Sequence, residues 1–96
     1  MYEHELCDPQ ADVSVTEAGW HAAIALPAQT TRIRLKTDQE VYCVLNRSSG
    51  DPAQTGAAIT PGVHHELVCR GASHLHLKKV GANATVTWTA VRAALS

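Results

Sequence analysis

Histidine is the residue type in this sequence best suited to metal binding or proton transfer, and the chain has six of them. His74 and His76 would project from one face of the same strand, and His64 and His65 lie at the start of another. A zinc site needs three or four converging donors, and the nearby carboxylate, Glu66, falls on the His64 face. The candidate metal ligands are therefore His64, His74 and His76. Because their spacing matches no known zinc pattern, we expect no metal and no other cofactor.

The three cysteines indicate a reducing compartment rather than a disulfide framework. Their number is odd, and no Cys-x-x-Cys pair is present. Cys43 and Cys69 lie in apolar stretches, so we expect both thiols to be core side chains. Cys7 lies in a polar, acidic segment, so we expect it to be exposed.

Nucleophilic catalysis would need a nucleophile and a base held within a supporting motif. Cys69 or Ser73 could be combined with His74 and Asp51, but no nucleophile elbow, oxyanion-type glycine motif or Cys-His signature surrounds them. Any chain of 96 residues offers such combinations by chance. The sequence therefore predicts a protein that is not an enzyme and has no small-molecule substrate.

Strands must position these side chains, because apolar and polar residues alternate along much of the chain. The clearest case is residues 31–36, where Ile33 and Leu35 share one face and basic residues take the other. These basic residues are Arg32, Arg34 and Lys36. The next stretch, 41–45, is apolar on both faces, which predicts a central strand. Residues 37–40 have the composition of a turn, so we expect the two strands to form a hairpin.

The same alternation predicts the other strands. They lie at residues 12–16, 20–26, 63–69, 74–80 and 85–91, with a brief pairing at 57–59. In the 74–80 stretch, the two leucines would point inward and the two histidines outward. Trp20 and Trp88 both fit inward core positions.

About six to eight short strands separated by turns are typical of an all-β protein. We expect a single antiparallel β-sandwich or a small jelly-roll-like barrel. A chain of 96 residues allows one domain. It would comprise an acidic N-terminal segment or arm, 1–19, with a candidate first strand, and a β-sandwich domain, 20–96.

Overall charge and hydropathy exclude several kinds of partner. Lys and Arg number 8 against 9 Asp and Glu, which argues against a general polyanion binder, so we expect no nucleic-acid partner. No apolar run approaches the roughly 18 residues of a membrane span. The first 20 residues carry acids where a signal peptide carries Lys or Arg. We expect a soluble protein with no membrane partner.

The charges are unevenly distributed, since every charged residue before Arg32 is acidic. The acidic segment could pack on the basic face of the 31–36 strand of its own chain. Alternatively, residues 1–9 could form an arm that reaches a basic surface on a neighbouring subunit. The interface residues would be the acids of the segment and the bases of the strand. They are Glu3, Glu5, Asp8, Asp12, Arg32, Arg34 and Lys36.

Five stretches of the chain resemble a pattern found in small structural proteins of tailed bacteriophages. They are residues 26–36 (LPAQTTRIRLK), 40–45 (EVYCVL), 59–63 (ITPGV), 71–75 (GASHL) and 85–89 (TVTWT). In those proteins a strand with Arg-Ile-Arg precedes a central strand with an aromatic residue. A polar loop, a Pro-x-Gly-Val approach to a hydrophobic strand, a glycine turn and a final Thr-Val alternation follow. The likeness spans about residues 20–90.

This resemblance implies a non-enzymatic virion protein with a β-sandwich fold, foremost a capsid decoration (cement) protein that binds and stabilises the major capsid lattice. Its partners would be the major capsid protein or other virion subunits, in a homo-oligomer or a symmetric assembly formed in the host cytoplasm. The alternatives are a phage tail or adhesion accessory subunit and a small ligand- or receptor-binding β module. The acidic first 19 residues and the histidine-rich strand have no counterpart in the pattern.

Overall fold

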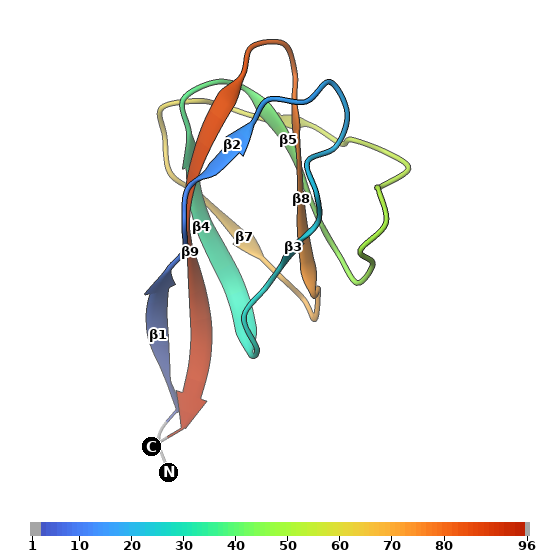
Figure 1. The fold of residues 1–96 in the computed structure, drawn as a ribbon. Coiled ribbons are helices and arrows are strands. Elements are labelled where there is room, and N and C mark those ends of the chain that lie inside the picture. Colours follow the sequence, from blue (N-terminus) through green and yellow to red (C-terminus); the bar gives the residue numbers. More distant parts are fainter. Residues whose placement is uncertain (1–2, 96) are drawn as a thin grey trace.

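The computed structural model describes residues 3–95, and these residues form two antiparallel β-sheets packed face to face (Figure 1). The all-β sandwich predicted from the sequence is therefore confirmed. The strands are β1 (Glu3–Pro9), β2 (Val13–Val15), β3 (Ile24–Ala25), β4 (Thr30–Thr37), β5 (Val41–Asn46), β6 (Ala58–Ile59), β7 (His65–Val68), β8 (His74–Lys79) and β9 (Ala84–Leu95).

The larger sheet is built around β9, which has 12 residues and is the longest strand. On one edge β9 pairs with β4, and β4 pairs in turn with β7. On its other edge β9 pairs with β1 over its C-terminal half and with β2 over its first residues. The two outer edges of this sheet are therefore formed by β1 with β2, and by β7.

The smaller sheet has the order β3-β8-β5-β6. The predicted hairpin between residues 31–36 and 41–45 is wrong, because β4 belongs to the larger sheet and β5 to the smaller one. The turn between the two strands is bonded to both sheets. The N–H of Thr85, in β9 of the larger sheet, donates to Asp38 Oδ1 at 2.7 Å. The N–H of Val80, just after β8 of the smaller sheet, donates to the Glu40 carbonyl at 3.3 Å. The turn thus crosses from one layer to the other.

The core lies between the two sheets and follows the predicted alternation of β4 and β9. Its fully buried side chains include Ile33, Leu35, Val41, Leu75, Leu77 and Val86, and Trp88 is 3% exposed. Burying an aliphatic side chain of this size stabilises a fold by roughly 1.5–3 kcal/mol. The strand predicted over residues 20–26 shrinks to β3, although the His21 N–H still donates to the Leu77 carbonyl of β8 at 2.8 Å.

The terminal ribbon is formed by β1 and residues 89–95 of β9, and its outer end, beyond the level of β4, projects from the rest of the sandwich (Figure 1). Glu3 and Glu5 pair with Leu95 and Ala93, whereas the first residue of β4, Thr30, is level with Arg92. Glu3 and Leu95, the ends of the described part of the chain, pair at the end of this ribbon, and the long axis of the molecule measures 47 Å. Residues 3–9 of the predicted arm form β1 and pair with β9 of their own chain, and Met1 and Tyr2 lie outside the described residues.

Candidate interaction surfaces

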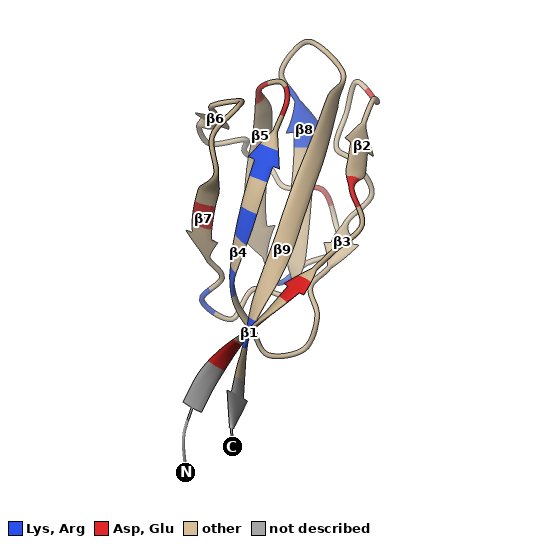
Figure 2. Ribbon diagram, turned by 90° about the vertical axis from the view of Figure 1, so that its left-hand side faces the viewer, with Lys and Arg blue, Asp and Glu red and all other residues tan. Residues whose placement is uncertain are grey.

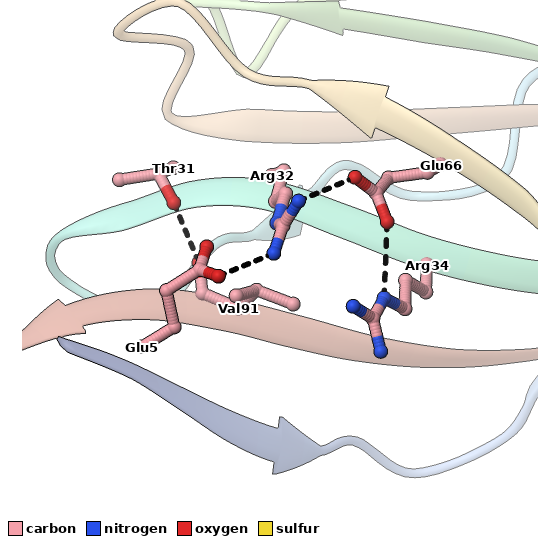
Figure 3. A network of polar contacts seen from close by, with 6 residues as sticks. All are labelled: Glu5, Thr31, Arg32, Arg34, Glu66 and Val91. Carbon is pink, nitrogen blue, oxygen red and sulfur yellow. Dashed lines mark hydrogen bonds and ion pairs between the residues drawn. The ribbon is translucent and has the colours of Figure 1, made fainter.

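A network of four charged side chains spans β1, β4 and β7 on the outer face of the larger sheet (Figure 3). Arg32 donates from Nη2 to Glu5 Oε1 and from Nη1 to Glu66 Oε1, the latter at 2.6 Å. Arg34 Nε donates to the other oxygen of Glu66 at 3.1 Å. We call Glu5, Arg32, Arg34 and Glu66 the ion network. Because β4 lies between β9 and β7, Arg32 can reach an acid on either side of it.

The ion network lowers the pKa of Glu66. The hydrogen bond from Arg34 is the main cause, and Arg32 adds to it, so the pKa falls below its ordinary value of 4.5. Desolvation is the second-largest contribution and opposes the shift without cancelling it. Glu66 therefore remains charged in neutral and mildly acidic solution.

The predicted interface residues are only partly brought together. Glu5 meets the basic face of its own chain, as the intramolecular arrangement requires, whereas Asp8 lies 3.7 Å from Arg92 of β9. Asp12 and Lys36 are exposed, and no ion pair within residues 3–95 involves either. The backbone of Glu3 pairs with Leu95, and its side chain lies outside the described part of the structure. Figure 2 shows the basic positions along β4 and the acidic ones on β1.

An open groove of about 510 Å³ lies beside the network on the same face. Thr87 and Thr89 of β9 lie between Cys7 of β1 and Arg34 of β4, and His64 lines the groove before β7 begins. Small side chains on the central strand and larger ones on its neighbours make this hollow. The uncovered face of the larger sheet therefore has both charged side chains and a groove that could hold side chains of a partner.

The candidate metal ligands do not form one site. His64 precedes β7 of the larger sheet, whereas His74 and His76 lie on β8 of the smaller sheet, with their ring centres 6.4 Å apart. Among the described residues no group of three or more His, Cys, Asp or Glu side chains could hold a metal ion.

His76 is fully buried, so the prediction that it points into solvent is wrong. Its Nε2 lies 2.8 Å from both Asn46 Oδ1 and the Ser48 carbonyl. Since Asn46 Oδ1 already accepts the Ser48 N–H, both neighbours of Nε2 are acceptors and Nε2 carries the proton. The alternation placed His76 on the correct face, but it did not reveal that the loop after β5 covers that face.

Trp20 is the other residue that covers His76, and its predicted core position is also wrong. Its ring is only partly buried and meets the His76 ring edge to face, with the centres 6.3 Å apart. Lys78 Nζ lies 5.8 Å from the centre of the indole ring. The His21 N–H donates to the Leu77 carbonyl at 2.8 Å and fixes this segment along β8. An aromatic side chain therefore lies on the outer surface of the smaller sheet.

The cysteines follow the predictions. Cys69 is buried, Cys43 packs against the core, and Cys7 is exposed. Burial raises the pKa of Cys43 to about 12, with a further contribution from the nearby Cys69 thiol. Burial also raises the pKa of Cys69. Neither buried thiol is therefore activated as a nucleophile.

The structure brings together only part of the catalytic combination considered from the sequence, which was Cys69 or Ser73 with His74 and Asp51. Ser73 Oγ lies 2.8 Å from His74 Nδ1, a contact between neighbours in the chain. Asp51 is exposed in the loop after β5, and no hydrogen bond or ion pair of the described residues joins it to His74 or Ser73. The described residues also contain no helix that could span a membrane.

A second hollow, not predicted from the sequence, lies between the end of β5 and the turn that joins β7 to β8. It measures about 490 Å³. Its apolar residues are Leu45, Val68, Cys69 and Ala72, and Arg47 and Arg70 flank them. We call it the arginine hollow. Its parts come from two distant stretches of sequence, so no local spacing could have indicated it.

The chain was compared with protein-family models, with curated proteins and with solved structures, and no match was found in any of the three.

Proposed function

We propose that this chain is a capsid decoration protein of a tailed bacteriophage, which binds the outside of the major capsid lattice and stabilises it. The observation that supports this most directly is the uncovered outer face of the larger sheet. There Arg34, Lys36, Glu66 and Thr87 are all exposed on hydrogen-bonded strands, and the groove lies beside them. A preorganised face of this kind can bind another subunit with little loss of conformational freedom.

The resemblance to phage structural proteins supplies the identity of the partner. Its Arg-Ile-Arg stretch lies in β4, its aromatic stretch in β5 and its Thr-Val stretch in β9. In a shell built of many copies, even a weak contact at each site becomes stabilising, because binding to the folded lattice opposes its disassembly.

The first test asks whether virions contain the chain. Mass spectrometry of purified particles of the phage that encodes it should detect many copies, and the purified chain should sediment with particles that lack it. Absence from virions, together with failure to sediment with capsids, would reject the proposal.

Two variants of one strand test which face docks. Thr87→Arg fills the groove, whereas Thr85→Arg adds the same side chain to an exposed position of β9 outside the groove lining. We expect the Thr87 variant to lose binding to capsids and the Thr85 variant to keep it. Equal binding by both variants would exclude the groove as the docking site.

A second candidate, an adhesion subunit that binds a receptor, is favoured by the position of Trp20. Aromatic side chains that are partly accessible on an outer surface are common in ligand and receptor sites. This alternative predicts that Trp20→Ala virions keep the protein but adsorb poorly to host cells. Normal adsorption of such virions would leave the decoration role as the better account.

A further inference from the structure

The outer edge of β1 carries backbone hydrogen-bonding groups that no strand of its own chain uses. β1 is the last strand of the larger sheet, and Figure 1 shows no described segment along its side away from β9. The Gln10 N–H donates to the Trp88 carbonyl at 3.0 Å, which fixes the direction of every backbone group in this ladder. Because the direction alternates along an antiparallel strand, the N–H and C=O groups of Leu6 face β9, whereas those of Glu5 and Cys7 face outward.

Pro9 agrees with this assignment, because it occupies another outward position of β1. Proline has no N–H to donate, and in sheets it is confined to positions where that group would face away from the ladder. No backbone hydrogen bond from elsewhere in residues 3–95 reaches the outward groups of Glu5 and Cys7. A row of unpaired N–H and C=O groups on an edge strand is a template for the strand of another molecule.

Leu6 adds an incompletely covered apolar side chain to this edge. It is 42% exposed and lies opposite Arg92, on the face of the ribbon away from Glu5. The carboxylate of Glu5 is bonded to Arg32, and that of Asp8 lies 3.7 Å from Arg92. These two acids are thus compensated within their own chain, whereas the side chain of Leu6 remains open to a partner.

The sequence of β1 is complementary to itself in one antiparallel register. Pairing of Glu3 with Pro9 of a second copy aligns all 7 residues of β1 and places Leu6 opposite the same residue at a two-fold axis. Glu5 of each copy then faces Cys7 of the other, and the outward groups of both residues can form ladder hydrogen bonds. No two acidic positions of β1 face each other in this register.

The neighbouring two-fold registers are less favourable. A register centred on Glu5 sets two carboxylates directly opposite each other, and like charges in that position destabilise a strand pair. A register centred on Cys7 sets Leu6 against Asp8, so the apolar side chain gains no apolar cover. Both shifts also shorten the paired length, so the register centred on Leu6 is preferred.

We propose that two copies of this chain pair antiparallel through the outer edges of β1, with Leu6 at the two-fold axis, so that their larger sheets join into one. The contact uses the same surface of both molecules, so it closes at a dimer. It leaves the outer faces of both larger sheets uncovered. The proposal concerns the isolated protein and does not depend on the proposed function, so either can fail without the other.

Two substitutions in the full chain test the use of this edge. Cys7→Pro removes an outward N–H but no hydrogen bond to β9, and its control is Cys7→Ala, which keeps the N–H. Leu6→Asp sets two like charges at the two-fold axis, and its control is Val80→Asp, at an apolar side chain that is 44% exposed elsewhere. Circular dichroism of each variant checks that it is folded.

Sedimentation equilibrium from about 10 µM to about 1 mM measures the association over the range of weak to moderate interfaces. We expect the wild type and both controls to form a dimer of twice 10.3 kDa and nothing larger. Cys7→Pro and Leu6→Asp should each sediment as a monomer.

A disulfide tests the register. In a chain with Leu6→Cys and Cys7→Ala, the two introduced thiols face each other in a pair without ladder hydrogen bonds. The Cα atoms of such a pair are about 4.5 Å apart, within the span of a disulfide. Oxidation by air with copper phenanthroline should therefore give a covalent dimer, detected by electrophoresis without reductant. The control chain, Val80→Cys with Cys7→Ala, should stay monomeric in the same gel.

Three results would overturn this proposal. The first is a wild type that remains monomeric at about 1 mM. The second is a dimer that persists in folded Cys7→Pro and Leu6→Asp, because another surface would then hold it. The third is oxidation that links Cys7 to Cys7 in the wild type and leaves the Leu6→Cys chain unlinked, because the strands would then pair in a different register.

Discussion

The environments of the three thiols differ enough to separate their reactivity. Because burial raises the pKa of Cys43 and Cys69, few thiolates form at these positions in the folded protein. We expect iodoacetamide at about pH 8, near the pKa of a free thiol, to modify Cys7 alone in the native protein and all three cysteines in denaturant. Peptide mass spectrometry measures this. Modification of Cys43 as fast as Cys7 would contradict the buried position.

Asn46 links the buried His76 to the loop that covers it. Its side-chain oxygen accepts hydrogen bonds from Ser48 N–H and from His76 Nε2. Asn46→Ala removes this acceptor, and we expect a loss of about 1–3 kcal/mol in the free energy of unfolding. Urea denaturation measures the loss. The control is Asn83→Ala, which removes an exposed hydrogen bond to Lys79 and should cost less than about 0.5 kcal/mol. Equal effects would show that the His76 link does not stabilise the fold.

The turn between β7 and β8 requires an unusual backbone conformation. Arg70 and Gly71 have φ values of 52° and 80°, and the Ala72 N–H donates to the Cys69 carbonyl at 2.9 Å. Positive φ at both central residues is the pattern of a type I′ turn, which favours Asn-Gly. A Cβ at position 71 would also lie 2.9 Å from Arg47 Nη2. Because position 71 has no side chain, the Arg47 guanidinium can lie against the turn that carries Arg70.

The positive φ values in this turn predict different effects on the free energy of unfolding for substitutions at its two central residues. We expect Gly71→Ala to lower the free energy of unfolding by about 1–2 kcal/mol, because an L side chain is strained at this φ. Arg70→Asn should leave it unchanged or raise it by a few tenths of a kcal/mol, since Asn suits the turn. Thermal unfolding measures both, and Gly19→Ala is the control, because a Cβ there meets nothing within 4 Å. A destabilising Arg70→Asn would argue against the turn assignment.

The ion network links three strands, and its contribution depends on pH. Because the folded-state pKa of Glu66 is lowered, its stabilising effect is fully present above the ordinary value of 4.5 and is lost as pH falls through the lower folded value. We expect Glu66→Gln to be less stable than the wild type at neutral pH. The difference should shrink as pH falls below 4.5. Urea denaturation across this range measures it, with the exposed Glu17→Gln as control. A difference that stays constant with pH would show that the charge of Glu66 contributes nothing.

The strand pattern could be predicted from the sequence, but the assignment of strands to sheets could not. Ile33 and Leu35 alternate with arginines, so local residues fix the inner and outer faces of β4. Whether β5 pairs with β4 depends on Asp38 and its distant partner Thr85, which no local pattern encodes. A short polar turn fits a hairpin and a crossing between layers equally well.

One of the candidate surfaces could be predicted from the sequence, and the others could not. The basic face of β4 was visible as a run of alternating residues, and Glu5 meets Arg32 there. The arginine hollow combines Arg47 with Arg70, 23 positions apart, and depends on the turn at Gly71. His76 is buried by Trp20, 56 positions earlier in the chain. Contacts of this kind become apparent only when the tertiary structure is known.

In the whole molecule, β1 lies outside the core of the sandwich. None of the described β1 side chains belongs to the buried core cluster, which is formed by residues from Val15 onward with Val13 packed against it. β1 is held by backbone pairing to β9 and by exposed ion pairs to Arg32 and Arg92. Exposed ion pairs add little to stability. The core is therefore formed without β1 side chains, and β1 is attached along the edge of β9.

Deletion of residues 1–9 tests that separation together with the assembly role. The shortened chain keeps both sheets and the Gln10 N–H to Trp88 carbonyl bond of 3.0 Å, so we expect β-type circular dichroism and cooperative unfolding to persist. If β1 contacts the capsid, the shortened chain should be lost from particles. Sedimentation and particle occupancy by quantitative mass spectrometry measure these effects, with the Val80→Asp chain as a full-length control. Unchanged occupancy would show that the ribbon plays no part in assembly, whereas loss of the β spectrum would show that β1 is part of the folding unit.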